Sequence, residues 1–269
     1  MPEIIKKTLR AVSPALYRFV RNRYRENTPY NRLARRVGRR LGWKVACGPF
    51  AGMKYLRGDC CERSLPKLLG SYEQELWPVL RRLRTMPVSA VINIGCAEGY
   101  YAVGLARLIP GIPVYAFDCL PSAREATRRA AEANGVAGRM RILGACDAAT
   151  LSALPLAGAL VVIDCEGAEI DILDPSIAPG LRDSWILVEL HDFVDPRITA
   201  ALRARFDATH EVEMIGPIGR DPSAFPPVAG LKPEVQALAL DEDRRWRGAP
   251  TPPTWAFMRP RRIRSTDAP

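Results

Sequence analysis

The sequence predicts an α/β fold built on a doubly wound, mostly parallel, seven-stranded sheet with an α-helical N-terminal extension. From residue 86 onward, short apolar runs alternate with segments of helical periodicity. One apolar run, Val91–Ile94, leads through two glycines directly into a helix-like segment, and polar residues follow the successive runs. This alternation is typical of a parallel sheet with right-handed crossovers and helices on both faces.

The individual elements follow from local patterns. Helices are expected where apolar residues recur every three to four positions, at residues 101–108, 122–134 and 196–206. Asn134-Gly135 suits a helix C-terminus, because glycine readily adopts a left-handed conformation there. Strands are expected at residues 88–94, 114–117, 140–143, 159–163, 185–190, 210–215 and 255–258.

Residues 1–85 are predicted to form a basic helical extension and a cap segment ahead of the sheet domain. Residues 3–42 are expected to be helical, residues 45–70 to contain a short hairpin, and residues 71–84 to form a helix with Ser71 as N-cap. The sheet domain is expected at residues 86–262, with a tail at 263–269. Residues 217–233 are rich in proline and predict a loop or lid rather than a core element.

The net charge of +10 is concentrated near the N-terminus, where thirteen basic residues between Lys6 and Lys44 face only Glu26. Such a segment can attract nucleic acid or an anionic membrane surface. Few aromatics interleave with the charges, so nucleic acid is not favoured as a partner. A solvated arginine-rich helix that packs its apolar side on the main domain is the simpler interpretation, although peripheral membrane contact stays an alternative.

Composition also bears on the compartment. No apolar run is long enough to cross a bilayer, and the N-terminus lacks the apolar core of a signal peptide, so cytoplasmic residence is expected. Seven cysteines, an odd count that includes adjacent Cys60 and Cys61, predict free thiols rather than a secreted disulfide framework.

The predicted site lies at the strand ends, because open parallel sheets bind ligands beyond the carboxyl ends of their strands. Asp118 stands 23 residues after Gly95, close to the spacing at which a carboxylate binds the ribose hydroxyls of a nucleoside. Asp147 can accept a hydrogen bond from adenine, or it can cap the helix that follows it. The polar or glycine residues after successive strands are Asn93, Gly95, Glu98 and Gly99; Asp118; Asp147; Asp164 and Glu166; and His191 and Asp192.

Two motifs carry a family resemblance. Asn93-Ile94-Gly95-Cys96-Ala97-Glu98-Gly99, between a strand and a helix, resembles the cofactor loop of class I S-adenosylmethionine-dependent methyltransferases and lacks the Gly-x-Gly-x-x-Gly of dinucleotide sites. Ile163-Asp164-Cys165-Glu166-Gly167-Ala168-Glu169 resembles the signature of the FkbM-like group. The resemblance implies a Rossmann-like sheet and methyl transfer from S-adenosylmethionine, most often to a hydroxyl of a sugar, glycan or small natural product.

The resemblance also implies roles for individual residues. Gly95, Cys96 and Gly99 would form the loop under the methionine part of the cofactor, with Tyr100 nearby. Asp118 would hold the ribose, Asp147 the adenine, and Asp164 would face the methyl group. Asn93 stands where the family commonly has an acid that binds the methionine ammonium group, and Glu98 is the candidate to replace that charge.

Three residues are candidates for activating the acceptor hydroxyl. His191 is the candidate base because its pKa lies near working pH, although a structural role fits the sequence equally well; Asp164 and Glu166 are alternatives. These three residues and Asp192 are all metal-ligand types, but they form no local metal motif, so no metal is predicted. Cys96, Cys119, Cys146 and Cys165 also follow strand ends, where small buried residues are the simplest interpretation.

Two other functions stay open at this stage. The basic N-terminus could deliver RNA or a protein to the same cofactor. Alternatively, because Asn93 removes a negative charge from the cofactor loop, the chain could be an inactive module that binds a cofactor or a partner.

Overall fold

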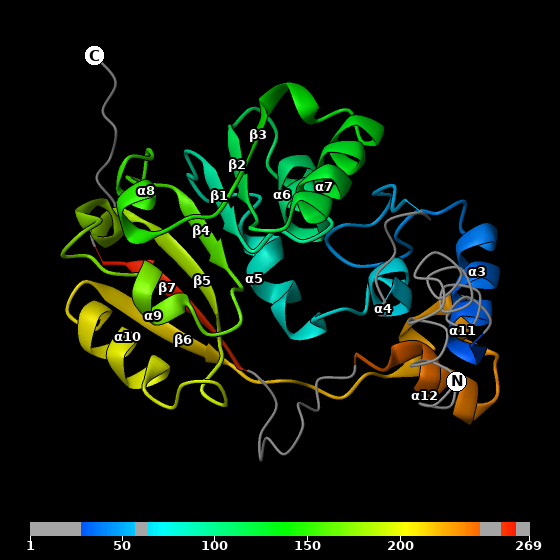
Figure 1. Cartoon of the computed structure of the whole chain (residues 1–269). Helices are drawn as coiled ribbons and strands as arrows, with labels where there is room; N and C mark the ends of the chain where they lie inside the picture. The colour runs from blue at the N-terminus through cyan, green and yellow to red at the C-terminus, as the bar shows by residue number, and fades with distance from the viewer. Residues whose placement is uncertain (1–27, 57–63, 243–253, 262–269) are drawn as a thin grey trace, which may run out of the picture.

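The computed structural model describes residues 28–56, 64–242 and 254–261. These residues form a seven-stranded sheet with the order β3-β2-β1-β4-β5-β7-β6 (Figure 1). Strands β1 to β5 pair in parallel, and β7 runs antiparallel between β5 and β6. The prediction of a mostly parallel, seven-stranded α/β sheet is confirmed. The strands are β1 (Val91–Ile94), β2 (Val114–Phe117), β3 (Met140–Leu143), β4 (Leu160–Ile163), β5 (Trp185–Leu190), β6 (His210–Ile215) and β7 (Thr254–Pro260).

The strands lie close to where the apolar runs predicted them. Every residue of β1, β4 and β5 is buried. This explains why their sequences are nearly continuous apolar runs rather than alternating apolar and polar residues. The clearest differences are at strand ends: β1 begins at Val91 instead of residue 88, and β7 continues to Pro260.

Helices cover both faces of the sheet, as expected of a doubly wound fold. Val91 packs on the face covered by α5, α6 and α7, whereas Ile92 and Ile94 pack on the face covered by α8, α9 and α10. These helices are α5 (Trp77–Arg82), α6 (Tyr100–Leu108), α7 (Pro121–Ala133), α8 (Ala148–Ser152), α9 (Glu169–Ile172) and α10 (Ile198–Phe206).

Beside the sheet, helices from both ends of the chain share a separate apolar core (Figure 1). It joins α3 (Pro29–Arg40) and α4 (Ser64–Leu69) to α11 (Pro226–Ala229) and α12 (Pro233–Leu240). Phe225 and Val228 are fully buried in it, so the prediction that residues 217–233 contain no core element was wrong, whereas residues 217–221 lie outside helices and strands as predicted. Four of the five prolines in this stretch, Pro222, Pro226, Pro227 and Pro233, stand in the first turns of short helices, where their missing N–H costs nothing.

The region before the sheet also differs from expectation. The helix predicted at residues 71–84 is divided into a short turn, η2 (Gln74–Leu76), and α5, after Glu73 takes a left-handed conformation with φ of 48°. The Ser71 hydroxyl caps no helix but donates to the carbonyl of Pro66 at 3.4 Å. The predicted hairpin is reduced to one antiparallel bridge between Lys44 and Lys54.

Most of the predicted basic segment, including its membrane-facing alternative, falls in residues 1–27, outside the described residues, as do Cys60 and Cys61. Of the part that is described, α3 is helical as predicted. In the described ranges, no helix is both long and apolar enough to cross a membrane. The five cysteines within those ranges are all free thiols, as predicted for them.

His210, at the start of β6, is expected to make the stability of the folded chain depend on pH. Its Nε2 lies 2.9 Å from the carbonyl oxygen of Ser184 and its Nδ1 lies 2.9 Å from the hydroxyl of Thr209, and burial lowers the pKa of the imidazole. The unfolded chain therefore binds a proton at a higher pH than the folded chain does. Stability is fully present above the ordinary pKa of histidine and falls as pH drops below it.

We expect His210→Gln to lose part of this acid sensitivity. Urea unfolding at pH 7 and pH 5.5, measured for both proteins, gives the comparison. The variant should lose less stability between the two pH values than the parent chain, whatever its stability at pH 7. An equal loss in both proteins would contradict a neutral, buried His210.

Candidate functional site

A cleft of about 430 Å³ opens at the carboxyl ends of the parallel strands. It lies where the strand order reverses, between β1 and β4, which is the usual ligand position in an open α/β sheet. Its size falls in the range of small-molecule sites. The lining comes from the loops after β1, β2, β3 and β4 and includes Gly95, Ala97, Asp118, Leu120, Cys146, Asp164 and Glu166.

Gly95 allows two of these loops to meet. It has a left-handed φ of 81°, and a Cβ added to it would lie 1.8 Å from the carbonyl oxygen of Asp164. No side chain fits in that space, so glycine is required for both conformation and contact. Gly99 also has positive φ, 88°, and α6 begins directly after it against Thr127 of α7.

Asp118 holds the loop after β1 in place. One of its carboxylate oxygens accepts from the N–H of Ala97 at 2.9 Å, and the other accepts from the N–H of Leu120 at 2.8 Å. A carboxylate has about four lone-pair positions, so each oxygen keeps capacity for another donor. Asp118 thus stands in the cleft with a fixed orientation and unused acceptor capacity.

Asp147 caps α8, as one of its two interpretations predicted. Its Oδ1 accepts from the N–H of Thr150 at 2.7 Å, and the residue is exposed. The cap does not exclude contact with adenine, because the carboxylate has a second oxygen, and that role stays a prediction.

The strand-end cysteines divide into two groups. Cys119, Cys146 and Cys165 line the cleft, and burial raises the pKa of the Cys146 thiol to about 12. Cys96 is not part of the lining; it is buried 3.5 Å from the hydroxyl of Thr127, and burial raises its pKa to about 11. Thiols with pKa values this high are poor nucleophiles at neutral pH.

Asn93 and Glu98, the predicted ammonium ligands, have different surroundings. Asn93 is buried; its amide donates to the carbonyl of Val162 at 3.3 Å, and its Oδ1 has no hydrogen-bond donor in the described part of the chain. The Glu98 carboxylate accepts from Lys67 and, at 2.9 Å, from Tyr55. Burial raises the pKa of Glu98, but the pairing with Lys67 outweighs it and the pKa is lowered.

Tyr100 belongs to an aromatic group beside this ion pair rather than to the cleft lining. Its ring lies 5.6 Å from that of Tyr72, and the Lys67 ammonium lies 4.7 Å from the centre of the Tyr72 ring. Lys67, Tyr55 and Tyr72 come from the segment before the sheet, so that segment packs against Glu98 and Tyr100 at the start of α6.

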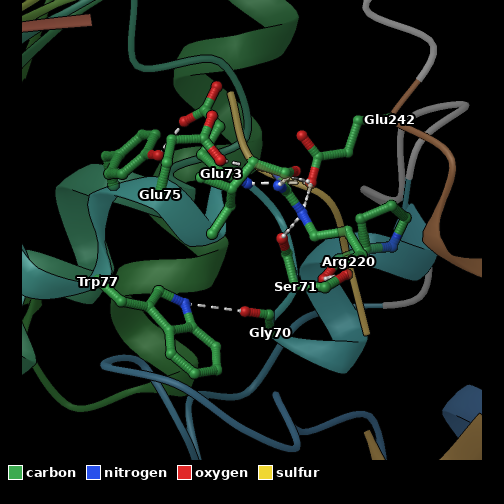
Figure 2. Close-up of polar contacts among 10 residues, drawn as sticks. Gly70, Ser71, Glu73, Glu75, Trp77, Arg220 and Glu242 are labelled. Atoms are coloured by element: carbon green, nitrogen blue, oxygen red, sulfur yellow. Dashed lines mark hydrogen bonds and ion pairs between the residues drawn. The ribbon is translucent and has the colours of Figure 1, made fainter. Parts of the chain in front are cut away.

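Arg220 ties the segment after β6 to the same region (Figure 2). Its guanidinium donates to Glu75 and Glu242, each at 2.8 Å, and to the carbonyl of Ser71 at 3.1 Å. Glu242 in turn accepts from the N–H of Glu73, whose carboxylate accepts from the Tyr101 hydroxyl. This buried network fixes the turn that carries Tyr72.

The three catalytic candidates, Asp164, Glu166 and His191, do come together. Nε2 of His191 lies 3.6 Å from Asp164 Oδ1 and 3.7 Å from Glu166 Oε2. Its Nδ1 lies 2.8 Å from the buried Glu169 carboxylate. Burial lowers the pKa of His191, but the hydrogen bond and charge of Glu169 raise it by more. Asp192 is separate, because its two oxygens accept from the N–H and hydroxyl of Thr199.

Sequence reasoning did not find Lys67, Glu189 or Arg220 as parts of this region. Glu189 was recognisable, since it is an acid inside the apolar run of β5, two positions before His191. Lys67 and Arg220 had no such signal, because their charged partners lie 31 or more residues away, apart from Glu242 at 22.

Gly95→Ala tests the contact between the loops after β1 and β4. Gly135→Ala is the matched control, since Gly135 also has positive φ, 69°, but a Cβ there meets nothing within 4 Å. The free energy of unfolding of the control should fall by about 1–2 kcal/mol, which is the cost of placing alanine in a left-handed conformation. In Gly95→Ala the free energy of unfolding in urea should fall by about 1–3 kcal/mol more than in the control, because the carbonyl of Asp164 must move. Equal losses would show that the loops do not approach this closely.

The sequence matches no model of a known protein family and no curated protein. Several solved structures resemble the fold. TomG from Streptomyces achromogenes, an O-methyltransferase in complex with SAM, is 19% identical with a TM-score of 0.42, over 72% of this chain and 85% of TomG. Cofactor-bound Rv0187 from MTB is 16% identical with a TM-score of 0.45, over 87% of this chain and 90% of that one.

An rRNA methylase from Streptococcus thermophilus is 12% identical with a TM-score of 0.44, over 68% of this chain and 94% of its own. TomG is described as an O-methyltransferase and the streptococcal protein as an rRNA methylase, and similarity of this degree concerns the fold alone. The function of this chain therefore has to be inferred from the geometry of its own cleft.

Proposed function

We propose that the chain is an S-adenosylmethionine-dependent methyltransferase that acts on a hydroxyl of a sugar, glycan or small natural product. The observation that carries the proposal is the cleft at the strand-order reversal, with the Asp118 carboxylate fixed at the end of β2. The cleft lacks the glycine pattern of a pyrophosphate site and offers carboxylates instead, which suits a nucleoside without phosphates.

The residues present fit this cofactor. The open acceptor positions of Asp118 suit two ribose hydroxyls, and Ile94, Phe117 and Leu120 give the cleft apolar surface for adenine. We assign the adenine amino group to Asp147, which follows β3 next to Cys146 of the lining. When bound, S-adenosylmethionine supplies an electrophilic methyl group on a positively charged sulfur.

Asn93 offers the clearest acceptor for the methionine ammonium group. Its Oδ1 is buried without a donor among the described residues, and a buried acceptor in that state is costly until a donor arrives. Glu98 already balances Lys67, so its charge acts on the pair rather than directly on a ligand. An amide in place of an acid is therefore compatible with cofactor binding.

The His191 cluster lies on the acceptor side of the cleft through Asp164 and Glu166, which belong to the lining. A carboxylate only accepts hydrogen bonds, so the His191 Nδ1 that faces Glu169 carries a proton, and Nε2 presents a lone pair when the imidazole is neutral. We assign activation of the acceptor hydroxyl to the group formed by His191, Asp164 and Glu166.

One observation keeps RNA as a second class of acceptor. Helix α3 contains no acidic residue, and Arg32, Arg36, Arg39 and Arg40 are exposed on it. These arginines can contact phosphates whether or not an RNA is methylated. RNA binding that weakens steeply with salt, together with methyl transfer to that RNA, would favour this alternative.

Asp118→Asn tests the proposed function by calorimetry with S-adenosylmethionine. Asp221→Asn is the matched control, because Asp221 also accepts the N–H two residues ahead but lies outside the cleft. The parent chain and the control should bind S-adenosylmethionine equally and should not bind NAD. Asp118→Asn should bind about ten- to a hundredfold more weakly, as expected for loss of charged hydrogen bonds to ribose.

Binding of NAD in place of S-adenosylmethionine would reject the proposed function. Unchanged S-adenosylmethionine affinity in Asp118→Asn would reject the ribose assignment while leaving the cofactor in place.

A further inference from the structure

The His191 imidazole points at a group of carboxylates that it does not hydrogen-bond. Asp164, Glu166 and Glu189 each place an oxygen 3.6–3.7 Å from Nε2, beyond the length of a hydrogen bond. Asp164 and Glu166 follow β4, whereas Glu189 and His191 belong to the end of β5. Residues 25 apart along the chain thus meet because β4 and β5 are parallel neighbours.

Glu169 fixes the orientation of the His191 imidazole through a contact at Nδ1. The His191 side chain is 3% exposed and that of Glu169 is fully buried, and the two share the 2.8 Å contact at Nδ1. The Glu169 carboxylate is itself held by the N–H of Cys165 at 3.0 Å. A histidine that binds metal through one nitrogen commonly donates its other N–H to a carboxylate in this way.

The charge of the cluster suits a cation. Asp164, Glu166, Glu169 and Glu189 surround one imidazole, and a divalent cation would stabilise the ionised forms of these carboxyl groups together. The buried ammonium of Lys67 is already paired with Glu98.

We propose that Asp164, Glu166 and Nε2 of His191 bind a divalent metal ion. One atom from each residue lies within 4.8 Å of the other two, so small side-chain movements bring all three to metal-ligand distance. Two carboxylates and one imidazole form a mixed oxygen and nitrogen ligand set for a divalent transition-metal ion, and Mn²⁺, which accepts carboxylate ligands, is the ion used to probe it. The sequence alone did not predict this site, since its ligands follow two different strands.

The role of the ion rests on the proposed function. Asp164 and Glu166 line the cleft, so an acceptor hydroxyl placed there would lie beside the ion. A divalent ion lowers the pKa of a hydroxyl next to it and makes its oxygen more nucleophilic. Nε2 of His191 would be a ligand when the ion is bound. Without the ion, the same nitrogen can accept a proton.

Mn²⁺ binding to the full chain, freed of metal with EDTA, tests the site. Electron paramagnetic resonance should show one Mn²⁺ taken up per chain, and pulsed spectra should show coupling to a nitrogen from His191. Because this coupling is measured on the unaltered chain, it does not depend on the folding of any variant.

Variants then locate the ion. His191→Gln should abolish the nitrogen coupling, and both it and Asp164→Asn should weaken Mn²⁺ binding at least about tenfold. Glu169→Gln should weaken binding by about tenfold and retain the coupling, since the imidazole loses only its charged support. Asp171→Asn, an exposed acid on the same short helix as Glu169, is the control and should bind like the parent chain.

Absence of Mn²⁺ binding at millimolar concentration, absence of nitrogen coupling, or unchanged affinity in both His191→Gln and Asp164→Asn would overturn the metal site. Calorimetry with S-adenosylmethionine separates this outcome from failure of the proposed function. A chain that binds the cofactor but not Mn²⁺ refutes the metal site alone. A chain that binds Mn²⁺ with nitrogen coupling but no cofactor refutes the methyltransferase.

Discussion

The close approach of the loop after β1 to the end of β4 is the constraint on which the rest of the site depends. Gly95 has no room for a side chain against the Asp164 carbonyl, and the N–H of Asp164 bonds to the carbonyl of Ile94 at 3.1 Å. Asp118 then fixes the other side of the same loop through Ala97. Strands β1, β2 and β4 thereby end at one level, and their polar residues share one cleft.

Charge burial imposes a second constraint around this cleft. Taking an ion out of water costs several kcal/mol, so buried charges persist only with complete sets of partners. Lys67 with Glu98 and Tyr55, and Arg220 with Glu75 and Glu242, are two groups of paired buried charges. The first joins the segment before the sheet to the loop after β1, and the second joins that segment to the residues after β6, at a cost in stability that apolar residues would avoid.

The sheet and its ligand edge could be predicted from the sequence because their signals are local. Buried parallel strands are continuous apolar runs, and a polar residue after such a run has to lie at the edge. The same reasoning failed for residues 217–233, where Phe225 and Val228 are buried in a core shared with α3 and α4. Proline marks the start of a short helix as readily as a loop, and only the distant packing decides between them.

The candidate site was predicted only in part for the same reason. The strand positions of Asp118, Asp164 and His191 follow from local pattern, but the direction of each side chain does not. That Glu98 faces Lys67, and that Glu169 holds His191, depends on contacts between segments 31 and 22 residues apart. A crystal structure with S-adenosylhomocysteine tests the central claim most directly. The account predicts adenosine in the cleft between the loops after β1, β2 and β4, with its ribose hydroxyls on Asp118; adenosine bound elsewhere would contradict it.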